Sequence, residues 1–471
     1  MAAPISLHHF GVCARNGELL LRQFTEKLTF RLFAKRETPV ARQWAVKNGN
    51  AVFVITENRH LPCSPCLPNA NGTKARTSTI EGICGDYSNL MNIPERANNV
   101  NSYFDNKIHS GVPHLSARIE PNSSIGYSDE CAGSDTTNPH QQQQWNNSVF
   151  NVCFNVQSVK EIVNRVSKFS GKHSLLQLPT SLSDSDGVVE YAVVYTGIGN
   201  IIHTLIDTSK YYGVFLPCFL NIESNDLTHG SLPGQSLYFD HVTYACHAGS
   251  SHSIMTWYES CFGLKRFFIN SDEDKDEGFT IKEEDFGLRL KAMEYWKCAE
   301  TGLTNQNDSH ESQANEIKIV FAEPLPGNAP NQVQQFLDHH GGPGIQHIGL
   351  HTNDIIETVS CMENLGVEFL NPPSTYYTEI GKLAEILFMG KNVEILRKHG
   401  ILLDIEADGG DRQPTNDKNA RYLMQVFTKP LFDSDTFFLE VIQRCGASGF
   451  GAGNITALWR SVQAFLRKSQ A

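Results

Sequence analysis

The sequence lacks long apolar runs and an excess of positive charge. No stretch approaches the roughly 20 apolar residues that a membrane-spanning helix requires, so no transmembrane segment is expected. The formal net charge of −12 over 471 residues gives no electrostatic reason to bind nucleic acid or an anionic membrane. The length predicts a globular protein of two or three domains. The negative charge predicts that nucleic acid is not a partner.

Closely spaced cysteines are also scarce. The 12 cysteines are scattered, and most stand singly inside apolar segments, which is typical of reduced thiols rather than of a disulfide framework. The motif CSPC at 63–66 has no second CxxC pair, so incidental cysteines explain it better than a zinc site does.

Two polar stretches divide the chain. Residues 58–147 are rich in Asn, Ser, Gly and Gln and have no periodic apolar positions, which predicts a low-complexity insertion without a core of its own. The Gly- and Pro-containing stretch at 224–235 predicts a linker. It would join an N-terminal domain over 1–223 to a C-terminal domain over 236–471.

Four segments resemble one another weakly. In each, an alternating strand is followed by a polar turn, a helical stretch and further alternating strands, which is a βαβββ unit. The opening strands are HHFGVCARN (8–16), VFNVCFNVQS (149–158), FDHVTYACH (239–247) and IQHIGLHTND (345–354). The helices are expected over 18–28, 159–169, 253–263 and 355–366. We therefore predict an α+β fold in which four units form two half-barrel domains. An amphipathic helix is expected at the C-terminus, over 455–469.

Three strand-like segments of the C-terminal half carry candidate metal ligands. His241 and His347 stand at matching places in neighbouring units, and Glu440 lies inside the apolar run TFFLEVIQR (436–444). A carboxylate inside such a strand is costly unless a positive group meets it. Each residue alone could be a satisfied core histidine or an edge-strand acid. Together, two histidines and one carboxylate are the ligand set of non-haem iron(II) oxygenases.

Longer motifs point to a known family. GGPGIQHIGLHTNDI (341–355), FLNPPSTYY (369–377), LMQVFTKPLF (423–432) and GFGAGN (449–454) resemble the 4-hydroxyphenylpyruvate dioxygenases of the vicinal-oxygen-chelate superfamily, and especially their vertebrate dioxygenase-like branch. The resemblance implies a vicinal-oxygen-chelate fold, an Fe(II) cofactor on His241, His347 and Glu440, and 4-hydroxyphenylpyruvate and O₂ as substrates. It places the protein in mitochondria, with the cytoplasm as the alternative, and allows a homodimer.

The resemblance also implies a set of substrate-binding residues. They correspond to positions in the dioxygenase family that contact the keto acid, its ring or the lid helix, namely Gln332, Gln346, Gln425, Phe427, Phe438, Phe450, Asn454 and Ile455. Strand alternation places Gln346 on the face opposite His347.

Some pocket positions depart from the dioxygenase pattern. Leu290 replaces a serine, Val320 and Ala322 replace a proline and an asparagine, and Ile455 replaces a lid phenylalanine. Isoleucine is common at this lid position in the sister family, 4-hydroxymandelate synthase. The resemblance therefore favours 4-hydroxymandelate as the product and a role in supplying the ubiquinone head group. The alternatives are a dioxygenase making homogentisate and a silent paralogue acting as a binding protein.

The N-terminal half keeps the repeat without the ligand set. His9 matches a ligand position, but Asn151 stands at the second, and Leu205 is expected near the third. We predict that this half is structural, with His8 and His9 packed or solvated rather than metal-bound.

Overall fold

The computed structural model describes residues 5–59, 147–222, 236–269, 273–283, 286–295, 318–326, 331–378, 382–406 and 420–458. Most of the predicted insertion, the whole predicted linker and the end of the predicted C-terminal helix lie outside these residues. None of the described helices is both long and apolar enough to cross a membrane.

The N-terminal half consists of two βαβββ units. The first contains β1 (Ile5–Cys13), α1 (Gly17–Arg22), η1 (Gln23–Lys27), β2 (Arg31–Glu37), β3 (Ala41–Asn48) and β4 (Ala51–Asn58). The second contains β5 (Ser148–Val156), α3 (Val159–Ser170), η3 (Lys172–Ser174), β6 (Leu175–Asp184), β7 (Gly187–Tyr195) and β8 (Ile202–Tyr211). The short β9 (Leu220–Asn221) then pairs with β2 at the edge of the sheet.

The C-terminal half repeats this order. Its first unit contains β10 (Tyr238–Ala245), α4 (Ser251–Phe262), β11 (Lys265–Phe267), β12 (Phe279–Glu283), β13 (Phe286–Glu294) and β14 (Lys318–Leu325), followed by α6 (Gln332–His340). The last unit contains β15 (Gly344–His351), α7 (Ile355–Asn364), α8 (Thr375–Thr378), α9 (Lys382–Phe388), α10 (Val393–Lys398), β16 (Leu402–Ile405), β17 (Tyr422–Phe427) and β18 (Phe438–Cys445). A lid helix follows over 452–458.

Local signals explain where the helices begin and end. The Ser158 hydroxyl accepts a hydrogen bond from Glu161 N at the start of α3, and Gly171 ends this helix at a φ of 85°. The Asp354 carboxylate caps α7 through Glu357 N in the same way. Such side chains satisfy backbone donors that have no partner inside the helix, while glycine adopts the left-handed conformation without strain.

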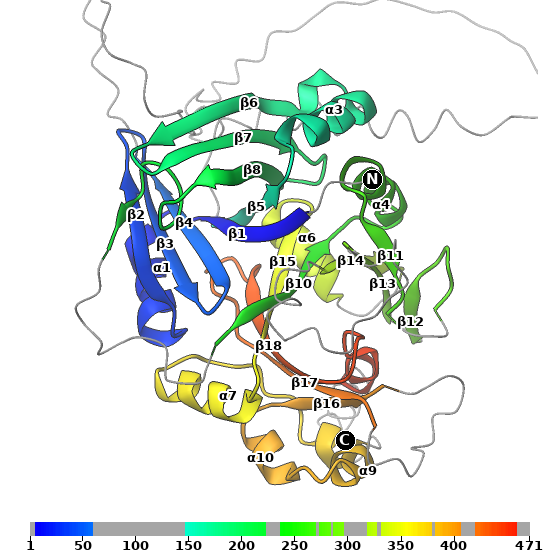
Figure 1. Cartoon of the computed structure of the whole chain (residues 1–471). Coiled ribbons are helices and arrows are strands. Elements are labelled where there is room, and N and C mark those ends of the chain that lie inside the picture. Colours follow the sequence, from blue (N-terminus) through cyan, green and yellow to red (C-terminus); the bar gives the residue numbers. More distant parts are fainter. Residues whose placement is uncertain are drawn as a thin grey trace, which may run out of the picture.

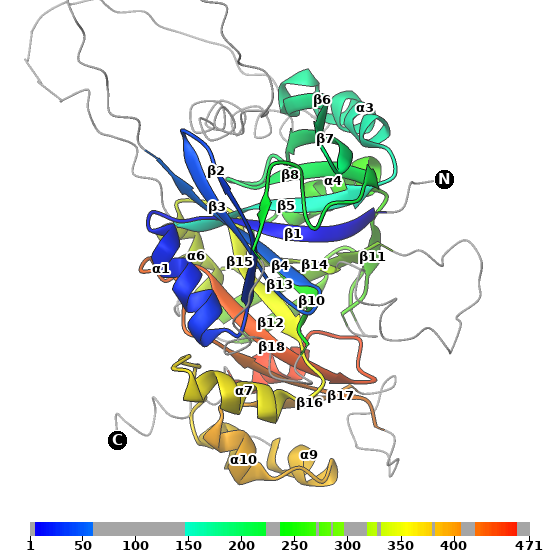
Figure 2. The same cartoon turned by 60° about the vertical axis from the view of Figure 1, so that its left-hand side comes forward.

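In each half, the opening strands of two units pair at the centre of one sheet. The N-terminal order is β6-β7-β8-β5-β1-β4-β3-β2-β9, and the C-terminal order is β11-β13-β14-β10-β15-β18-β17-β16 with β12 beside β13. Figures 1 and 2 show the two sheets as separate layers, with α7, α9 and α10 beyond the C-terminal sheet. The predicted fold of four units in two half-barrels is confirmed.

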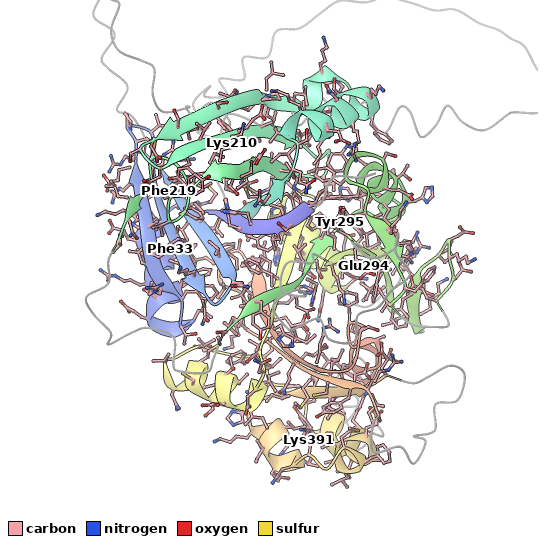
Figure 3. The ribbon with its side chains drawn as sticks, in the orientation of Figure 1. Phe33, Lys210, Phe219, Glu294, Tyr295 and Lys391 are labelled. Carbon is pink, nitrogen blue, oxygen red and sulfur yellow. The ribbon has the colours of Figure 1, made fainter. Side chains whose placement is uncertain are left out.

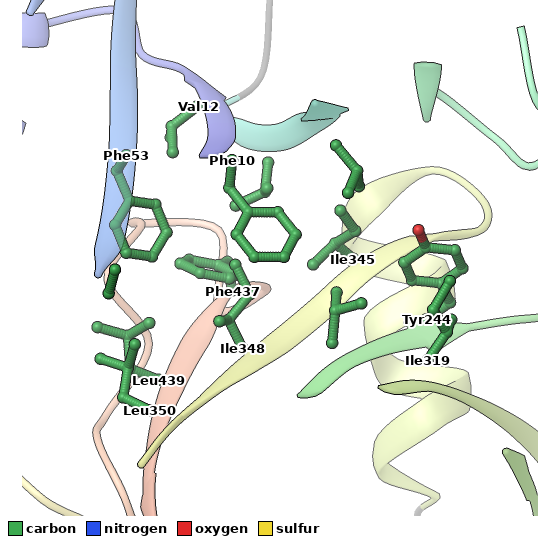
Figure 4. Close-up of a cluster of buried hydrophobic side chains, with 14 of the residues drawn as sticks. Phe10, Val12, Phe53, Tyr244, Ile319, Ile345, Ile348, Leu350, Phe437 and Leu439 are labelled. Atoms are coloured by element: carbon green, nitrogen blue, oxygen red, sulfur yellow. The ribbon is translucent and has the colours of Figure 1, made fainter. Parts of the chain in front are cut away.

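One face of each sheet packs against the other half of the molecule. Phe10 and Phe53 from the N-terminal sheet lie near Ile345 and Ile348 from the C-terminal sheet (Figure 4). Phe239 joins them, with ring centroids 4.7 Å from Phe10 and 5.3 Å from Phe53. The two halves therefore share a hydrophobic core, and the opposite face of each sheet is left to line the interior of its own half-barrel.

The predicted insertion joins two strands that flank a single neighbour. Cys13 at the end of β1 pairs with Thr56 near the end of β4 and with Ser148 at the start of β5. The edges of the insertion therefore lie on either side of β1, at one end of the N-terminal sheet.

The shared core predicts that damage in one half destabilises both. Phe53 is fully buried and contacts the rings of Phe10, Phe24, Phe30 and Phe239. Phe53→Ala is expected to lower the free energy of unfolding by about 3–5 kcal/mol through lost contacts and a cavity. Chemical denaturation followed by near-ultraviolet circular dichroism checks this. Phe169→Ala, at a side chain that is 43% exposed, serves as the control. Loss of structure in the N-terminal half alone would contradict a shared core.

Candidate metal centre

Three strands of the C-terminal sheet bring the predicted ligands together. β15 lies between β10, to which it is antiparallel, and β18, to which it is parallel. A ligand atom from each of His241, His347 and Glu440 lies within 4.8 Å of the others. His241 and Glu440 are buried, and the His347 side chain keeps 14% exposure. Residues far apart in the sequence thus form one compact cluster.

A glycine in the middle strand makes room for this cluster. Gly349 pairs with His241 on one side and with Glu440 on the other. A Cβ atom on Gly349 would lie only 2.4 Å from His241 Cε1, so a side chain there would displace the imidazole. Without it, His241 Nε2 reaches within 3.2 Å of Glu440 Oε2, and His347 Nε2 lies 3.6 Å from the same oxygen.

Two β-bulges supply partners for the other nitrogen of each histidine. One bulge, between Phe239 and His241, lets the Asp240 carboxylate accept a 2.7 Å hydrogen bond from His241 Nδ1. The other leaves Gln346 without a partner on β10, and its Oε1 lies 3.2 Å from His347 Nδ1. The predicted placement of Gln346 opposite His347 is therefore wrong, because alternation fails at a bulge. Both Nδ1 atoms are engaged, which leaves both Nε2 atoms for a metal.

Arg444 completes this arrangement behind His241. Its Nε and Nη2 donate to the two oxygens of Asp240 at 2.6 and 2.7 Å. Its Nη1 donates to the carbonyl oxygens of Ala447 and Gly449, at the turn before the lid helix. One guanidinium thus joins the partner of a metal ligand to the lid.

Burial and charge set the protonation of the site. Burial lowers the pKa of His241, but the carboxylates of Glu440 and Asp240 outweigh it and raise this pKa to about 9. Burial and the charge of His241 together lower the pKa of His347 well below its usual value. Burial raises the pKa of Asp240, yet Arg444 and His241 overcome it and hold this pKa well below its usual range. In the metal-free protein, His241 therefore carries the proton that a metal would displace.

The residues fit the metal that the resemblance implies. Two imidazoles and a carboxylate match the ligand set of non-haem iron(II) oxygenases. Buried polar atoms normally have hydrogen-bond partners. Two of the predicted substrate-binding side chains do not obey this rule, since Gln425 Oε1 and Asn454 Nδ2 are buried and have no hydrogen-bond partner. A bound ligand would supply partners for both atoms.

Aromatic rings surround the predicted ligands. Phe438 stacks on His347 with ring centroids 4.9 Å apart, and Phe450 meets the edge of His241 at 5.0 Å. Phe427, directly opposite Glu440 in β17, lies 6.0 Å from the Phe438 ring. Three of the predicted substrate-binding residues therefore lie at the cluster.

The other predicted substrate residues divide into two groups. Gln425 and Asn454 are buried, and Asn454 Oδ1 accepts a 2.6 Å hydrogen bond from the Tyr376 hydroxyl. Ile455, on the lid helix, is partly buried. Gln332 is exposed at the first residue of α6, so the structure does not bring it among the buried side chains of the site.

The departures from the dioxygenase pattern lie together. Leu290 pairs with Ala322 across β13 and β14, and both belong to one hydrophobic cluster with Val320 and Phe450. Ile455 packs against this cluster from the lid helix. The replacements therefore make one continuous apolar wall next to the metal ligands.

Hydrogen bonds join the turn before the lid helix, and the start of that helix, to Asp404 in β16 and to Glu406, the residue after β16. Glu406 accepts hydrogen bonds from the backbone nitrogens of Ser448 and Gly449 at 3.1 and 3.0 Å. Asp404 accepts one from Gly453 N at 3.0 Å, and Lys382 donates to Asp404 at 2.8 Å. These contacts hold Phe450 over His241.

Sequence reasoning missed Asp240 and Arg444. Their signals were present, because Asp240 directly precedes a predicted ligand and Arg444 follows Glu440 at an even spacing on the same strand face. What the sequence could not show is that the two would meet across 204 positions.

The fold and this site define a class of protein. The chain carries two histidines and a carboxylate on one sheet built from paired βαβββ units. Its residues 239–384 match the family model described as the Glyoxalase/Bleomycin resistance protein/Dioxygenase superfamily. Within it, the chain belongs to the 4-hydroxyphenylpyruvate dioxygenase family.

Two relatives place the chain in this family. It is 38% identical to the 4-hydroxyphenylpyruvate dioxygenase-like protein of Rattus norvegicus over 328 residues, which are 69% of this chain and 79% of that protein. It is 31% identical to 4-hydroxyphenylpyruvate dioxygenase of Tetrahymena thermophila over 339 residues, 70% and 74% of the two chains. The predicted family is confirmed.

A solved structure shares the fold. A triple mutant of 4-hydroxymandelate synthase from Streptomyces coelicolor superposes with a TM-score of 0.62 at 21% identity, over 98% of each chain.

The contact between His241 and Asp240 predicts a measurable effect on metal affinity. Asp240→Asn removes the charge that orients His241 and takes from Arg444 the carboxylate it pairs with, so iron(II) affinity is expected to fall by about 10–100-fold. Metal titration of the purified protein measures it, with Asp338→Asn on the exposed face of α6 as the matched control. Unchanged affinity in Asp240→Asn would contradict the orienting role.

The raised pKa of His241 predicts a pH dependence. Below about 9 the metal-free site holds a proton on His241, so apparent metal affinity should rise by about tenfold per pH unit and level off above that pKa. Calorimetric titration in buffers of different ionisation enthalpy should detect about one proton released per metal near pH 7. Proton release that does not decline above about pH 9 would show that another group is titrating.

Proposed function

We propose that the protein is an Fe(II)-dependent oxygenase that converts 4-hydroxyphenylpyruvate and O₂ to 4-hydroxymandelate and CO₂. The observation that carries the proposal is the convergence of His241, His347 and Glu440 in one buried cluster. Two buried polar atoms without partners, on the predicted substrate-binding residues Gln425 and Asn454, support it. Membership of the 4-hydroxyphenylpyruvate dioxygenase family supports the substrate class.

The three ligand side chains would hold the iron, and the remaining residues would prepare the substrate. Bound iron(II) supplies the chelation of a 2-oxo acid and the activation of O₂ that amino-acid side chains do not provide. Asp240 and Gln346 fix the rings of the two histidines. Gln425 and Asn454 are suited to hydrogen-bond the polar groups of the substrate.

The rings around the metal cluster are suited to the aromatic part of the substrate. Phe427 and Phe438 lie on one side of the cluster, and Phe450 covers His241. Phe267 packs against Phe450 at 5.8 Å and extends this cover. A site enclosed in this way excludes water, which protects reactive intermediates from side reactions.

The apolar wall supports 4-hydroxymandelate as the product. Decarboxylation of the keto acid leaves one carbon less and two added oxygen atoms, and these oxygens can end in 4-hydroxymandelate or in its isomer homogentisate. The choice depends on whether the benzylic carbon or the ring lies in reach, and about 1 Å of displacement is enough to change it. Ile455 leaves more space above the ring than phenylalanine would, and Leu290 offers no hydrogen bond to the substrate.

Product identification tests this proposal. The purified protein, incubated with iron(II), ascorbate, 4-hydroxyphenylpyruvate and O₂, is expected to form 4-hydroxymandelate. Because the two products are isomers, chromatographic separation against both standards is required in addition to mass. Ile455→Phe is expected to shift at least part of the product to homogentisate, whereas Ile455→Val serves as the control and should leave the product unchanged. Homogentisate as the sole product of the unaltered protein would refute the choice of product.

A binding protein without turnover is the second candidate. The loss of polar side chains at Leu290 and Ala322 favours it, since both face the apolar cluster at the site. Tight binding of iron and 4-hydroxyphenylpyruvate without any product, and loss of iron in Glu440→Gln, would establish this candidate instead.

The proposal includes a cellular role. 4-Hydroxymandelate carries a ring and a benzylic oxygen from which the ubiquinone head group can be made, so we propose a mitochondrial location and a supply of this precursor. Fractionation of cells and isotope tracing from labelled tyrosine into ubiquinone would test both points.

A further inference from the structure

The N-terminal half-barrel contains a second cluster of metal-binding side chains. Ligand atoms of His8, His9 and Cys153 all lie within 4.8 Å of one another. His9 and Cys153 are almost fully buried, and they pair directly across β1 and β5. The sequence predicted two packed histidines here, and the structure adds a thiol to them.

A β-bulge brings the two histidines to the same side of the sheet. Adjacent residues of a regular strand point to opposite faces. The bulge between Leu7 and His9 breaks this alternation, and the Nδ1 atoms of His8 and His9 approach to 2.7 Å. In the C-terminal half the equivalent bulge lies between Phe239 and His241, where it sets Asp240 beside His241. The device that builds the catalytic cluster therefore recurs in the N-terminal half.

The strand registers show which residues of the two halves occupy equivalent positions around the β-bulge. His9 pairs with Cys153, as His241 pairs with Gly349. Cys153 pairs in turn with Thr204, as Gly349 pairs with Glu440. Thr204, and not the expected Leu205, is thus the counterpart of Glu440.

The two halves differ in where the third ligand can come from. Leu205 is buried in the core shared by the two halves, so it faces away from the cluster. The Thr204 hydroxyl donates to Asn151 Oδ1 at 3.1 Å, which commits both side chains to each other. The ligand group that Glu440 supplies in one half is replaced in the other by the thiol of Cys153, at the position where the catalytic half has glycine.

A cavity reaches this cluster from the interior of the half-barrel. Its volume is about 70 Å³, and its walls include His9, Asn151 and Thr204. A cavity of this size has room for more than one water molecule. The Phe215 ring packs against both histidines, with ring centroids 5.4 Å from His8 and 5.6 Å from His9. Phe33, in β2, and Phe219, directly before β9, also contact the Phe215 ring, and both are labelled in Figure 3.

We propose that His8, His9 and Cys153 bind a zinc ion, with water from the cavity as a fourth ligand. A thiolate and two imidazoles suit zinc, and an open fourth position is common in its sites. Binding exchanges the hydrogen bond between the rings for two Nδ1 bonds to the ion. The donor ring gives up its Nδ1 proton and takes up one on Nε2 from solvent, so it stays neutral, and the thiol proton is released to solvent. Tetrahedral zinc separates two nitrogen ligands by about 3.4 Å, so the rings need to move apart by less than 1 Å.

Cobalt substitution tests the proposal, because a thiolate bound to cobalt(II) absorbs in the near ultraviolet and a site of histidine and carboxylate ligands does not. The metal-free full-length protein is titrated with cobalt(II) and the bound equivalents are counted. We expect two equivalents and the thiolate band. Cys153→Ser should remove the band and one equivalent, while Cys13→Ser, at a buried thiol on β1, the strand of His8 and His9, should retain both.

Further variants separate the two sites and control for misfolding. Glu440→Gln should lose the other equivalent and keep the thiolate band, so failure of the catalytic assignment and failure of the zinc assignment are distinguishable. His8→Gln, at a partly exposed side chain, should weaken the second site in a protein with an unchanged circular dichroism spectrum. The absence of a thiolate band at saturating cobalt in the unaltered protein, or an identical band in Cys153→Ser, would overturn the proposal.

Discussion

The buried ion pair between Arg444 and Asp240 is the interaction on which the candidate site depends. A buried charge pair gains little net free energy, because the desolvation of both groups offsets their attraction. Its importance lies in the positions it fixes. Arg444 belongs to the same strand as Glu440, Asp240 adjoins His241, and the guanidinium also holds the turn that carries Phe450. One interaction therefore keeps two ligands in register and places the lid over them.

In each half, a β-bulge rather than regular strand pairing brings the potential metal ligands and their partners to one face of the sheet. In a regular strand Asp240 and His241 would face opposite sides, and so would His8 and His9. The bulges bring each pair to one side, where the identity of the neighbour decides the outcome. An aspartate orients the C-terminal histidine, whereas in the N-terminal half a second histidine lies beside the first. The same β-bulge therefore occurs in both halves, and different side chains surround it in each half.

The sequence predicted the repeat and the metal cluster for physical reasons that are local. Alternation along strands and the matching places of His241 and His347 were enough to predict that equivalent strands bring ligands to one sheet. The sequence predictions failed where the pairing with a neighbouring strand decides which way a side chain points. Gln346 and the choice between Thr204 and Leu205 depend on bulges and register, which no single strand encodes. Cys153 near His9 and Arg444 near Asp240 are contacts of distant segments.

The position of the insertion has a consequence for how the length of this chain can vary. Thr56 and Ser148 flank Cys13 in adjacent strands, so the two edges of the insertion lie about 10 Å apart, twice the spacing between strands. A connection of a few residues would span that gap. Each doubling of such a loop costs only about 0.6 kcal/mol in closure entropy. Length can therefore be gained or lost at this end of the N-terminal sheet with little effect on stability, and without changing the register of the strands that carry the ligands.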